Sequence, residues 1–268
     1  MVDRYAVIGN PVEHSKSPLI HAAFARLTGQ DMTYERILAP IGGFGECVEQ
    51  FRSEGGCGVN VTVPFKEDAY LYATHRTARA ELAGAVNTLH FREDGSVLGD
   101  TTDGVGLVRD VVSNLGVALK GKRVLLMGAG GAARGVIQPL LDEHPTSLML
   151  VNRSIDKVLA LAETFPGIDA TGYDGLNGQS FDVVINATAS SLNNDLPPLP
   201  ENIFSQGALA YDMMYGRETP FMRFAREQGA GAIADGLGML IEQAAESFFI
   251  WRGVRPETAP VLASFRAA

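Results

Sequence analysis

Residues 124–133 read Val-Leu-Leu-Met-Gly-Ala-Gly-Gly-Ala-Ala, a short apolar run that leads directly into a glycine-rich turn. The run is typical of a buried strand, and Gly128-x-Gly130-x-x-Ala133 between a strand and a helix is typical of a dinucleotide site. Gly128 permits a tight turn, Gly130 lets the backbone approach a pyrophosphate, and the small Ala133 allows close packing of helix on strand. The N–H groups at the helix start then face the anion. This stretch predicts a Rossmann-like domain.

The end of the next strand indicates which dinucleotide is bound. Residues 148–151 are apolar, and Asn152-Arg153-Ser154 follow, with Lys157 one turn later. A site for NAD usually has an acidic residue here, which would repel a 2′-phosphate, whereas a guanidinium binds it with paired donors. Arg153 and Lys157 could also be solvated surface residues, and Ser154 could be a helix cap. Their position favours NADP(H).

Strands and helices alternate on both sides of this turn, which predicts an α/β protein with mainly parallel sheets. We expect two αβ domains with the active site in the cleft between them. A substrate-binding domain with a mainly parallel sheet spans residues 1–102 and is completed by C-terminal helices at 237–268, and a Rossmann-like NADP-binding domain spans 103–236. Pro18 suits the first turn of a helix with Ser17 as its N-cap. Besides 124–127 and 148–151, strands are expected near 5–8, 33–38, 59–63, 183–185 and 208–212, a hairpin at 85–89 and 97–100, and helices near 17–27, 44–53, 156–165 and 238–251.

Composition excludes several classes of protein. The chain has 268 residues, 46% of them hydrophobic and 20% charged, and its net charge of -9 argues against a nucleic-acid partner. No apolar run approaches the ~20 residues of a membrane helix, and no signal peptide is recognisable, so we expect a cytoplasmic location. Cys47 and Cys57 lack metal-ligand spacing, and the five histidines are scattered, so we predict no metal site.

Residues 59–66 read Val-Asn-Val-Thr-Val-Pro-Phe-Lys. In a strand the valines point to one face, while Asn60 and Thr62 point to the other. Pro64 cannot continue a central strand, so Lys66 follows the strand end. An amide, a hydroxyl and an ammonium together suit a polyhydroxylated small molecule. An edge strand with a wet face is the alternative.

Asp103, in Thr101-Thr102-Asp103-Gly104, precedes a predicted helix. It could be a helix cap, the commonest use of Asp in this position. Together with Lys66 it supplies a carboxylate and an ammonium, an arrangement that suits proton transfer at an alcohol.

Seven motifs occur in order along the chain. They are Gly9-Asn10-Pro11 with His14-Ser15-Lys16-Ser17-Pro18, Asn60-Val61-Thr62-Val63-Pro64-Phe65-Lys66, Gly84-Ala85-Val86-Asn87-Thr88, Thr102-Asp103-Gly104, Gly128 to Ala132, Asn152-Arg153-Ser154 and Asp235-Gly236-Leu237-Gly238-Met239. At these motifs the sequence resembles the shikimate dehydrogenase family, from residue 5 to about residue 251. The resemblance implies an NADP-dependent oxidoreductase that interconverts 3-dehydroshikimate and shikimate in chorismate and aromatic amino-acid biosynthesis.

The resemblance also implies roles for individual residues. Lys66 is the implied acid/base and Asp103 its partner. The implied ligands of the substrate carboxylate are Ser15, Ser17 and Tyr215. The implied ligands of the ring hydroxyls are Asn60, Thr62, Lys66, Asn87, Asp103 and Gln243. The implied cofactor contacts are Gly128, Ala129, Gly130, Gly131, Ala132, Asn152, Arg153, Ser154, Lys157, Met213 and Gly236.

Several positions depart from the family pattern. Residues 186–191 read Asn-Ala-Thr-Ala-Ser-Ser where the family usually has Asn-Ala-Thr-Ser-Ser-Gly, so Ala189 and Ser191 differ near the expected nicotinamide site. Ala78 stands where many members have an acidic residue, and Thr101 where many have Asn.

Two other functions compete with this one. A quinate/shikimate dehydrogenase with relaxed substrate or NAD use shares the fold and the Lys–Asp pair, and a non-catalytic NADP-binding regulator would share only the fold. Paired serines and Arg153 favour shikimate with NADP, and an intact Lys66 and Asp103 favour an enzyme. A monomer and a homodimer are both compatible with the sequence.

Overall fold

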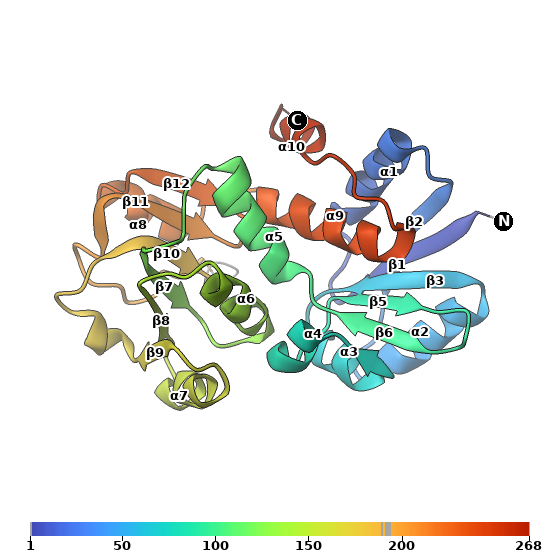
Figure 1. The fold of residues 1–268 in the computed structure, drawn as a ribbon, viewed down its shortest axis with the longest axis horizontal. Coiled ribbons are helices and arrows are strands. Elements are labelled where there is room, and N and C mark those ends of the chain that lie inside the picture. Colours follow the sequence, from blue (N-terminus) through green and yellow to red (C-terminus); the bar gives the residue numbers. More distant parts are fainter. Residues whose placement is uncertain (1, 189, 191–193, 268) are drawn as a thin grey trace. The chain divides into compact units, whose positions relative to one another are not determined.

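The computed structural model describes residues 2–188, 190 and 194–267. The chain folds into two compact units, one formed by residues 1–106 and 241–268 and the other by residues 107–240 (Figure 1). We call these the first unit and the second unit. Each contains a six-stranded sheet with helices packed on it, so the predicted α/β class is confirmed.

The first unit has a mixed sheet with strand order β2-β1-β3-β5-β6-β4. Strands β1, β2 and β3 are parallel, whereas β5 is antiparallel to both β3 and β6, as the predicted hairpin requires. The strands are β1 (Asp3–Gly9), β2 (Met32–Leu38), β3 (Gly56–Val61), β4 (His75–Arg76), β5 (Thr88–Phe91) and β6 (Val97–Asp100).

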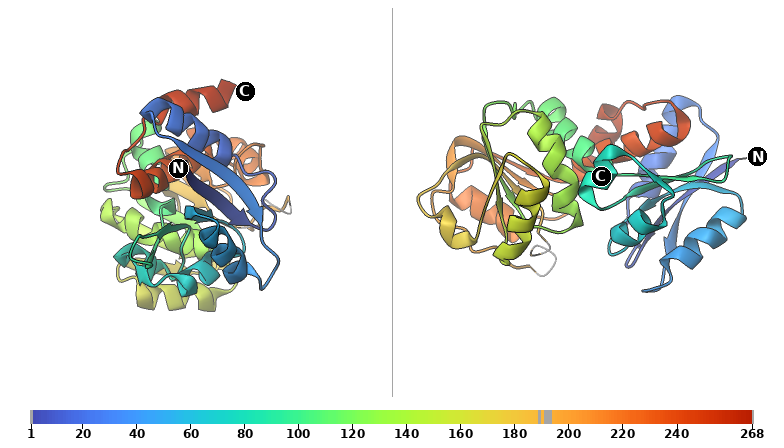
Figure 2. Two further views of the ribbon diagram at one scale, coloured as in Figure 1. Left: turned by 90° about the vertical axis from the view of Figure 1, so that its right-hand side faces the viewer. Right: turned by 60° about the horizontal axis from the view of Figure 1, so that its bottom comes forward.

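Helices cover both faces of this sheet (Figures 1 and 2). Val59 and Val61 of β3 pack with Phe44 and Phe65 on the face of α2 and α3, while the intervening Asn60 points to the other face, where it contacts Ser247 of α9 (Leu237–Arg252). The helices of this unit are α1 (Ser17–Thr28), α2 (Phe44–Ser53), α3 (Lys66–Tyr72), α4 (Ala78–Ala83) and α10 (Ala259–Ala267). Two more, α5 (Asp103–Arg109) and α9 (Leu237–Arg252), begin in one unit and end in the other.

The prediction that Ser17 is the N-cap of α1 is wrong. Lys16 is the cap residue and Ser17 the first helical residue, followed by Pro18. The hydroxyl of Ser15 accepts a hydrogen bond from the Ser17 N–H at 3.3 Å, so the serine two positions earlier satisfies this terminal donor. The predicted end of the helix is confirmed, because Gly29 adopts a left-handed conformation (φ 64°) directly after Thr28.

The second unit has an all-parallel sheet with strand order β12-β11-β10-β7-β8-β9. Its strands are β7 (Arg123–Met127), β8 (Ser147–Val151), β9 (Ile168–Thr171), β10 (Phe181–Asn186), β11 (Phe204–Asp212) and β12 (Ala232–Asp235). Its helices are α6 (Gly131–Asp142), α7 (Ile155–Thr164) and α8 (Pro220–Glu227), with a π-helical turn η1 (Asp110–Asn114) and a 3-10 turn η2 (Tyr173–Leu176).

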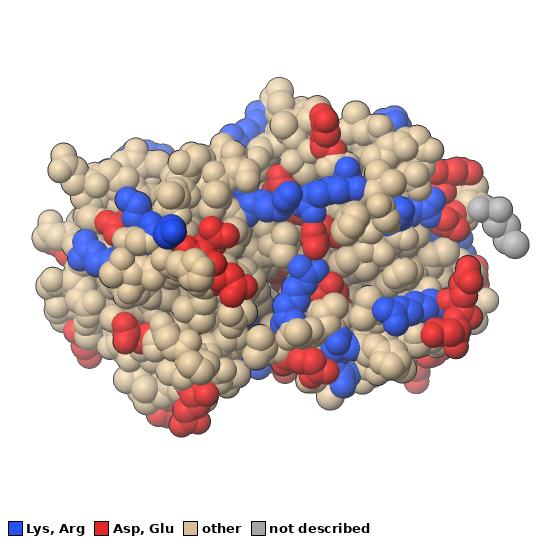
Figure 3. Space-filling model, viewed as in Figure 1, with Lys and Arg blue, Asp and Glu red and all other residues tan. Residues whose placement is uncertain are grey.

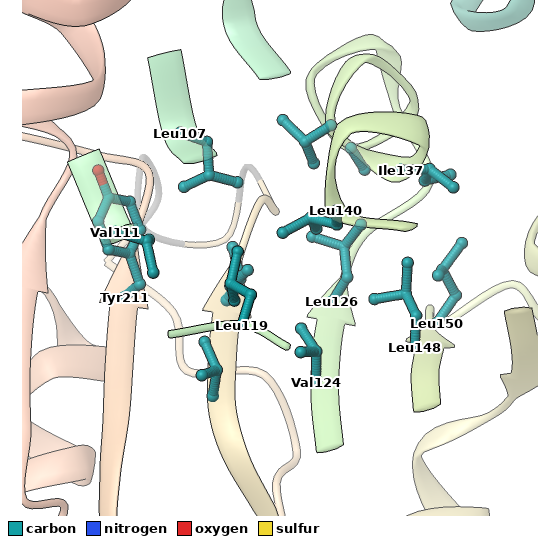
Figure 4. Packing of buried hydrophobic residues seen from close by; sticks show 14 of the residues in the cluster. Leu107, Val111, Leu119, Val124, Leu126, Ile137, Leu140, Leu148, Leu150 and Tyr211 are labelled. Carbon is teal, nitrogen blue, oxygen red and sulfur yellow. The ribbon is translucent and has the colours of Figure 1, made fainter. Parts of the chain in front are cut away.

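Both faces of this sheet are buried, as its continuous apolar strands predict. Val124 and Leu126 pack with α6 and α7 on one face, where Leu140 and Leu150 also lie (Figure 4). The alternate residues of β7 pack with α8 on the other face. Each such side chain contributes about 1.5–3 kcal/mol when it is fully buried, so the sheet is a rigid support for the turns at its ends.

Candidate active site

Three strands of the first unit bring polar side chains to one edge of its sheet. The register aligns Asn60 of β3 with Thr88 of β5, and Thr88 with Asp100 of β6. Because β5 runs antiparallel to both neighbours, the residues after β3, before β5 and after β6 meet at this edge. Lys66, Asn87 and Asp103 come from these three connections.

Lys66 and Asp103 form an ion pair at the start of two helices. The Lys66 Nζ lies 2.5 Å from the Asp103 Oδ2, and the side chains are 19% and 10% exposed. The other carboxylate oxygen accepts a hydrogen bond of 2.8 Å from the Asn87 amide. The carboxylate therefore faces the ammonium and the amide, and the cap interpretation is not needed to explain it.

The orientation of the Asn87 amide follows from its partners. Its Oδ1 accepts hydrogen bonds from the Thr102 backbone N–H at 2.9 Å and from the Thr88 hydroxyl at 2.8 Å. The amide nitrogen must then point toward Asp103, because a backbone N–H can only donate. It also lies 3.4 Å from the Gln243 Oε1 of α9.

Asn60 belongs to the same buried network, and its amide nitrogen also donates to the Asn87 carbonyl at 3.2 Å. Its amide nitrogen donates to the Ser247 hydroxyl at 2.9 Å and the Thr88 hydroxyl at 3.1 Å, and its Oδ1 accepts from the Tyr34 hydroxyl at 2.8 Å. Both amide hydrogens have protein partners, so a substrate hydroxyl could bind Asn60 only at its Oδ1.

A histidine stacks on this network. The ring of His21 lies 4.2 Å from that of Tyr34, centroid to centroid, and the two planes are inclined by 6°. Among the described residues, neither imidazole nitrogen has a hydrogen-bond partner. Burial lowers the pKa of His21 to about 3, although the nearby Asn60 side chain opposes the shift, so the ring is neutral.

Ser15 and Ser17 form a second group. Their hydroxyls are 3.2 Å apart, and the Arg36 guanidinium holds the Ser15 backbone carbonyl. The Ser17 hydroxyl also touches Tyr34, where it opposes the strong rise that burial causes in the pKa of that phenol. Tyr34 thus joins the serines to Asn60. Thr62 packs beside Gly9, where an added Cβ would lie 2.4 Å from the Thr62 methyl group.

The second unit carries the glycine turn in the geometry that its sequence predicts. Gly128 has a φ of 117° and donates its N–H to the Val151 carbonyl at 2.8 Å. Gly130 is the N-cap residue of α6, without a side-chain cap, and a Cβ added to it would meet no atom within 4 Å. The open space over Gly130 and the uncapped helix start fit a pyrophosphate.

The basic residues lie at the end of the adjacent strand. Met127 of β7 is aligned with Val151 of β8, so Gly128 and Asn152 leave the sheet side by side. Arg153 and Lys157 are exposed, as is Ser154, which is the N-cap residue of α7 but makes no side-chain cap bond. An exposed guanidinium at this position fits a ribose 2′-phosphate.

Met213 and Tyr215 lie on the turn after β11, beside Gly236. The Gly236 N–H donates to the Met214 carbonyl at 2.8 Å, and a Cβ at Gly236 would lie 2.2 Å from the Met213 carbonyl oxygen. Only glycine therefore fits at 236 against this turn. Burial raises the pKa of Tyr215, so its hydroxyl remains a hydrogen-bond donor.

The charged surface, the metal-ligating side chains and the helix lengths also bear on the predictions from composition. Basic side chains are interspersed with acidic ones on the face shown in Figure 3. No group of three His, Cys, Asp or Glu side chains in the described part of the chain is arranged to hold a metal ion. Likewise, none of the described helices is both long and apolar enough to cross a membrane.

Comparison with known proteins identifies the family. Residues 7–89 match a model of the shikimate dehydrogenase substrate-binding domain, residues 110–194 a model of shikimate / quinate 5-dehydrogenase, and residues 236–264 a model of the shikimate 5′-dehydrogenase C-terminal domain. A shikimate dehydrogenase (NADP(+)) of Methylobacillus flagellatus is 63% identical, with 100% of both chains covered. The chain belongs to the shikimate dehydrogenase family.

Solved structures of similar proteins share the fold of this chain. An Ael1 enzyme from Pseudomonas putida is 49% identical, with a TM-score of 0.93, and the match covers 98% of this chain and 97% of that one. Shikimate 5-dehydrogenase from Thermus thermophilus, solved in complex with NADP(H) and shikimate, is 31% identical, with a TM-score of 0.88 and 99% of both chains covered.

The departures from the family pattern fall in different places. Ala189 and Ser191 lie outside the described residues. Ala78 is an exposed first residue of α4. Thr101 is buried, and its N–H donates to the Asp100 carboxylate at 2.7 Å. A backbone contact of this kind is open to Thr and Asn alike.

Sequence reasoning missed four members of the network, namely Tyr34, Thr88, Thr102 and Ser247. Thr88 and Thr102 stand beside Asn87 and Asp103 in the motifs, and only those neighbours have an implied role. Ser247 follows Gln243 by one helical turn, so a search for polar residues at this spacing along α9 would have found it. No local signal singles out Tyr34, because its role depends on the pairing of β1 with β2 and β3.

Proposed function

We propose that this chain catalyses the reversible NADPH-dependent reduction of 3-dehydroshikimate to shikimate, in chorismate and aromatic amino-acid biosynthesis. The observation that carries the proposal is the Lys66–Asp103 ion pair, held by Asn87 within a chain of the shikimate dehydrogenase family. A non-catalytic regulator would not require this pair.

Lys66 is the general acid and base of the proposed reaction. In reduction its ammonium gives a proton to the oxygen of the former ketone, and in oxidation its amine takes a proton from the alcohol. NADPH, when bound, supplies the hydride. Asp103 keeps the ammonium and the substrate hydroxyl aligned, and Asn87 keeps Asp103 aligned through the 2.8 Å hydrogen bond.

The first unit binds the substrate in this proposal, and residues 1–102 with 237–268 form the substrate domain. Ser15 and Ser17 bind the carboxylate, together with Tyr215 of the cofactor domain. Neutral hydroxyl donors suit a carboxylate, whereas a phosphorylated substrate would need a basic cluster. Thr62, Asn87 and Gln243 bind ring hydroxyls together with Lys66, Asp103 and the Asn60 Oδ1.

Residues 103–236 form the cofactor domain. The turn from Gly128 to Ala132 binds the pyrophosphate, and Asn152, Arg153, Ser154 and Lys157 bind the adenosine end with its 2′-phosphate. Met213 and Gly236 contact the nicotinamide end. An uncapped helix start and an exposed arginine support these assignments.

Quinate is a second candidate substrate, because the family model that matches residues 110–194 is described for both shikimate and quinate dehydrogenases. The two acids share the carboxylate and ring hydroxyls that the proposed ligands bind. The paired serine hydroxyls and Arg153 favour shikimate with NADP.

A four-way steady-state assay tests the proposal, with shikimate or quinate as substrate and NADP or NAD as cofactor. We expect the highest kcat/KM with shikimate and NADP, followed as the formation of reduced nicotinamide. A higher kcat/KM with quinate, or with NAD, would instead favour a quinate/shikimate dehydrogenase with relaxed substrate or NAD use. If no pair gave substrate-dependent reduction of the nicotinamide, the proposal that the chain is an enzyme would be refuted.

We further expect a cytoplasmic enzyme that acts on a small molecule without a nucleic-acid or membrane partner, as a monomer or homodimer.

A further inference from the structure

Asp212 is a fully buried carboxylate at the end of β11, and no role has been assigned to it so far. Its Oδ1 accepts the backbone N–H of Met214 at 2.9 Å. Its Oδ2 accepts the Thr219 hydroxyl at 2.6 Å and the Asn186 amide at 3.1 Å. At least three donors of the described residues thus converge on one side chain inside the second unit.

These bonds join three separate segments at the carboxyl edge of the parallel sheet. Met214 lies in the turn after β11, Asn186 ends β10, and Thr219 is the N-cap residue of α8. Asn186 is fixed in turn, because its Oδ1 accepts the N–H and the hydroxyl of Thr188, and its carbonyl accepts the Met213 N–H at 3.0 Å. Asp212 is the centre of this arrangement.

The geometry points to Asp212 as a positioning residue for the proposed reaction: its carboxylate holds the 213–215 turn so that Met213 and Tyr215 keep their places. This inference rests on the proposed function, since Met213 and Tyr215 are proposed to contact the nicotinamide and the substrate carboxylate. Gly236 also lies close to this turn, because a Cβ at 236 would lie 2.2 Å from the Met213 carbonyl oxygen. The turn is therefore held both by the Asp212 carboxylate and by a close backbone contact with Gly236.

The charge of Asp212 matters as much as its shape. A carboxylate only accepts hydrogen bonds, so it satisfies three donors at once. Asp212→Asn keeps the shape but replaces one acceptor oxygen with an N–H₂ donor. That donor must face either the Met214 N–H or the Asn186 amide, and reversing the Asn186 amide would take the acceptor away from Thr188.

The test compares Asp212→Asn with Asp182→Asn in the full chain. Asp182 serves as the control because it also accepts a backbone N–H and a hydroxyl, those of Arg123 at 2.8 Å and Ser205 at 2.7 Å, near the amino end of β10, although its side chain is 28% exposed. We expect Asp212→Asn to raise KM for shikimate and lower kcat, changing kcat/KM by about ten- to a hundredfold in total. The pH dependence of kcat/KM should keep its wild-type form, because Lys66 and Asp103 are untouched. Asp182→Asn should leave kcat and KM within about twofold of wild type.

A double variant separates positioning from general destabilisation. If Asp212 acts through Tyr215, then Asp212→Asn should add little to the rise in KM that Tyr215→Phe already causes. The KM of the double variant should therefore rise by less than the product of the two single fold-changes. Multiplicative effects on KM would overturn the inference. If Asp212→Asn does not fold, Thr219→Val, which removes one of the three donors, should raise KM by about two- to fivefold. An unchanged KM in that variant would contradict the inference.

Wild-type activity distinguishes the two proposals. An active wild type together with a normal Asp212→Asn overturns the positioning role alone. A wild type that does not reduce NADP with shikimate refutes the proposed function and the role of Asp212 with it.

Discussion

The two units present their functional groups in different ways. The first unit uses buried side chains, and hydrogen bonds fix the orientation of Asn60, Asn87 and Asp103. The second unit uses mainly backbone, at the glycine turn after β7, and exposed basic side chains at the end of β8. A mixed sheet supports the first group and an all-parallel sheet the second.

The difference indicates how each site can fail. A side-chain network depends on the polarity of every member, so one exchange of oxygen for nitrogen disturbs several bonds. A backbone site depends on the space above a glycine and on local charge. Substitutions in the first unit should therefore lower kcat, whereas substitutions in the second unit should weaken binding of the cofactor.

Asp103→Asn should have the largest effect among the following variants. An amide at 103 can accept from Asn87 only by turning its N–H₂ toward Lys66, so the ion pair is lost. We expect kcat to fall about 10²–10³-fold, with the dissociation constant of NADPH within about twofold of wild type. If the affinity for NADPH fell as much as kcat, the assignment of chemistry to the first unit and of cofactor binding to the second would be wrong.

His21 should make the first unit sensitive to acid. Its pKa is about 3 in the folded protein, against an ordinary value of 6.5 for a solvated histidine of the unfolded chain. Between these values the unfolded state binds more protons, so stability falls as pH falls. We expect the first unit to lose about 2–3 kcal/mol between pH 7 and pH 4.5 through this residue. Urea unfolding at both pH values measures the loss.

The control for this prediction is a second histidine. His21→Phe should reduce the loss of stability on acidification, whereas His75→Phe, at an exposed position, should not. Equal pH dependence in wild type and His21→Phe would show that the buried imidazole is not responsible.

Arg153→Ala tests the charged part of the cofactor site. A hydrogen bond to a charged group contributes about 1.5–3 kcal/mol, so NADP should bind about 10- to 100-fold more weakly while NAD changes little. Arg123→Ala, at the other edge of the sheet, should alter neither dissociation constant. Equal weakening of NADP and NAD by Arg153→Ala would contradict the 2′-phosphate assignment.

Gly130→Ala tests the space that a pyrophosphate would occupy, and Gly128→Ala tests the strain of a positive φ. A Cβ at 130 meets no protein atom within 4 Å, so the melting temperature should not change, but NADP should bind about tenfold more weakly, a loss of about 1.4 kcal/mol. Gly128 has a φ of 117°, so alanine there should cost about 1–3 kcal/mol of stability. Normal NADP affinity in Gly130→Ala would place the pyrophosphate elsewhere.

The sequence predicts most of the fold, because its strong signals are local. The glycine turn, the β5–β6 hairpin around Asp94-Gly95 and helix α2 all follow from residues close in the chain. Strands β9 and β12 were not predicted, because they are four-residue edge strands without a continuous apolar run. The cap of α1 was misplaced, because Ser15 and Ser17 are both suitable residues and only the backbone decides between them.

The candidate site divides in the same way. Lys66 and Asp103 could be proposed because each lies in a distinctive motif, and the structure brings them within 2.5 Å. The bonds that fix Asn60 could not be predicted, because they need the register of β3 with β5 and the return of α9, 187 residues later in the chain. Asp212 was also missed, since its neighbours Thr219 and Asn186 come together only in the folded sheet.

Lys66→Ala gives the most direct test of the account, with kcat measured at saturating shikimate and NADP and compared with Lys120→Ala, an exposed lysine in the second unit. If Lys66 transfers the proton, its loss should lower kcat about 10²–10⁴-fold while Lys120→Ala retains wild-type turnover. A Lys66→Ala enzyme with near-normal kcat would contradict the central claim.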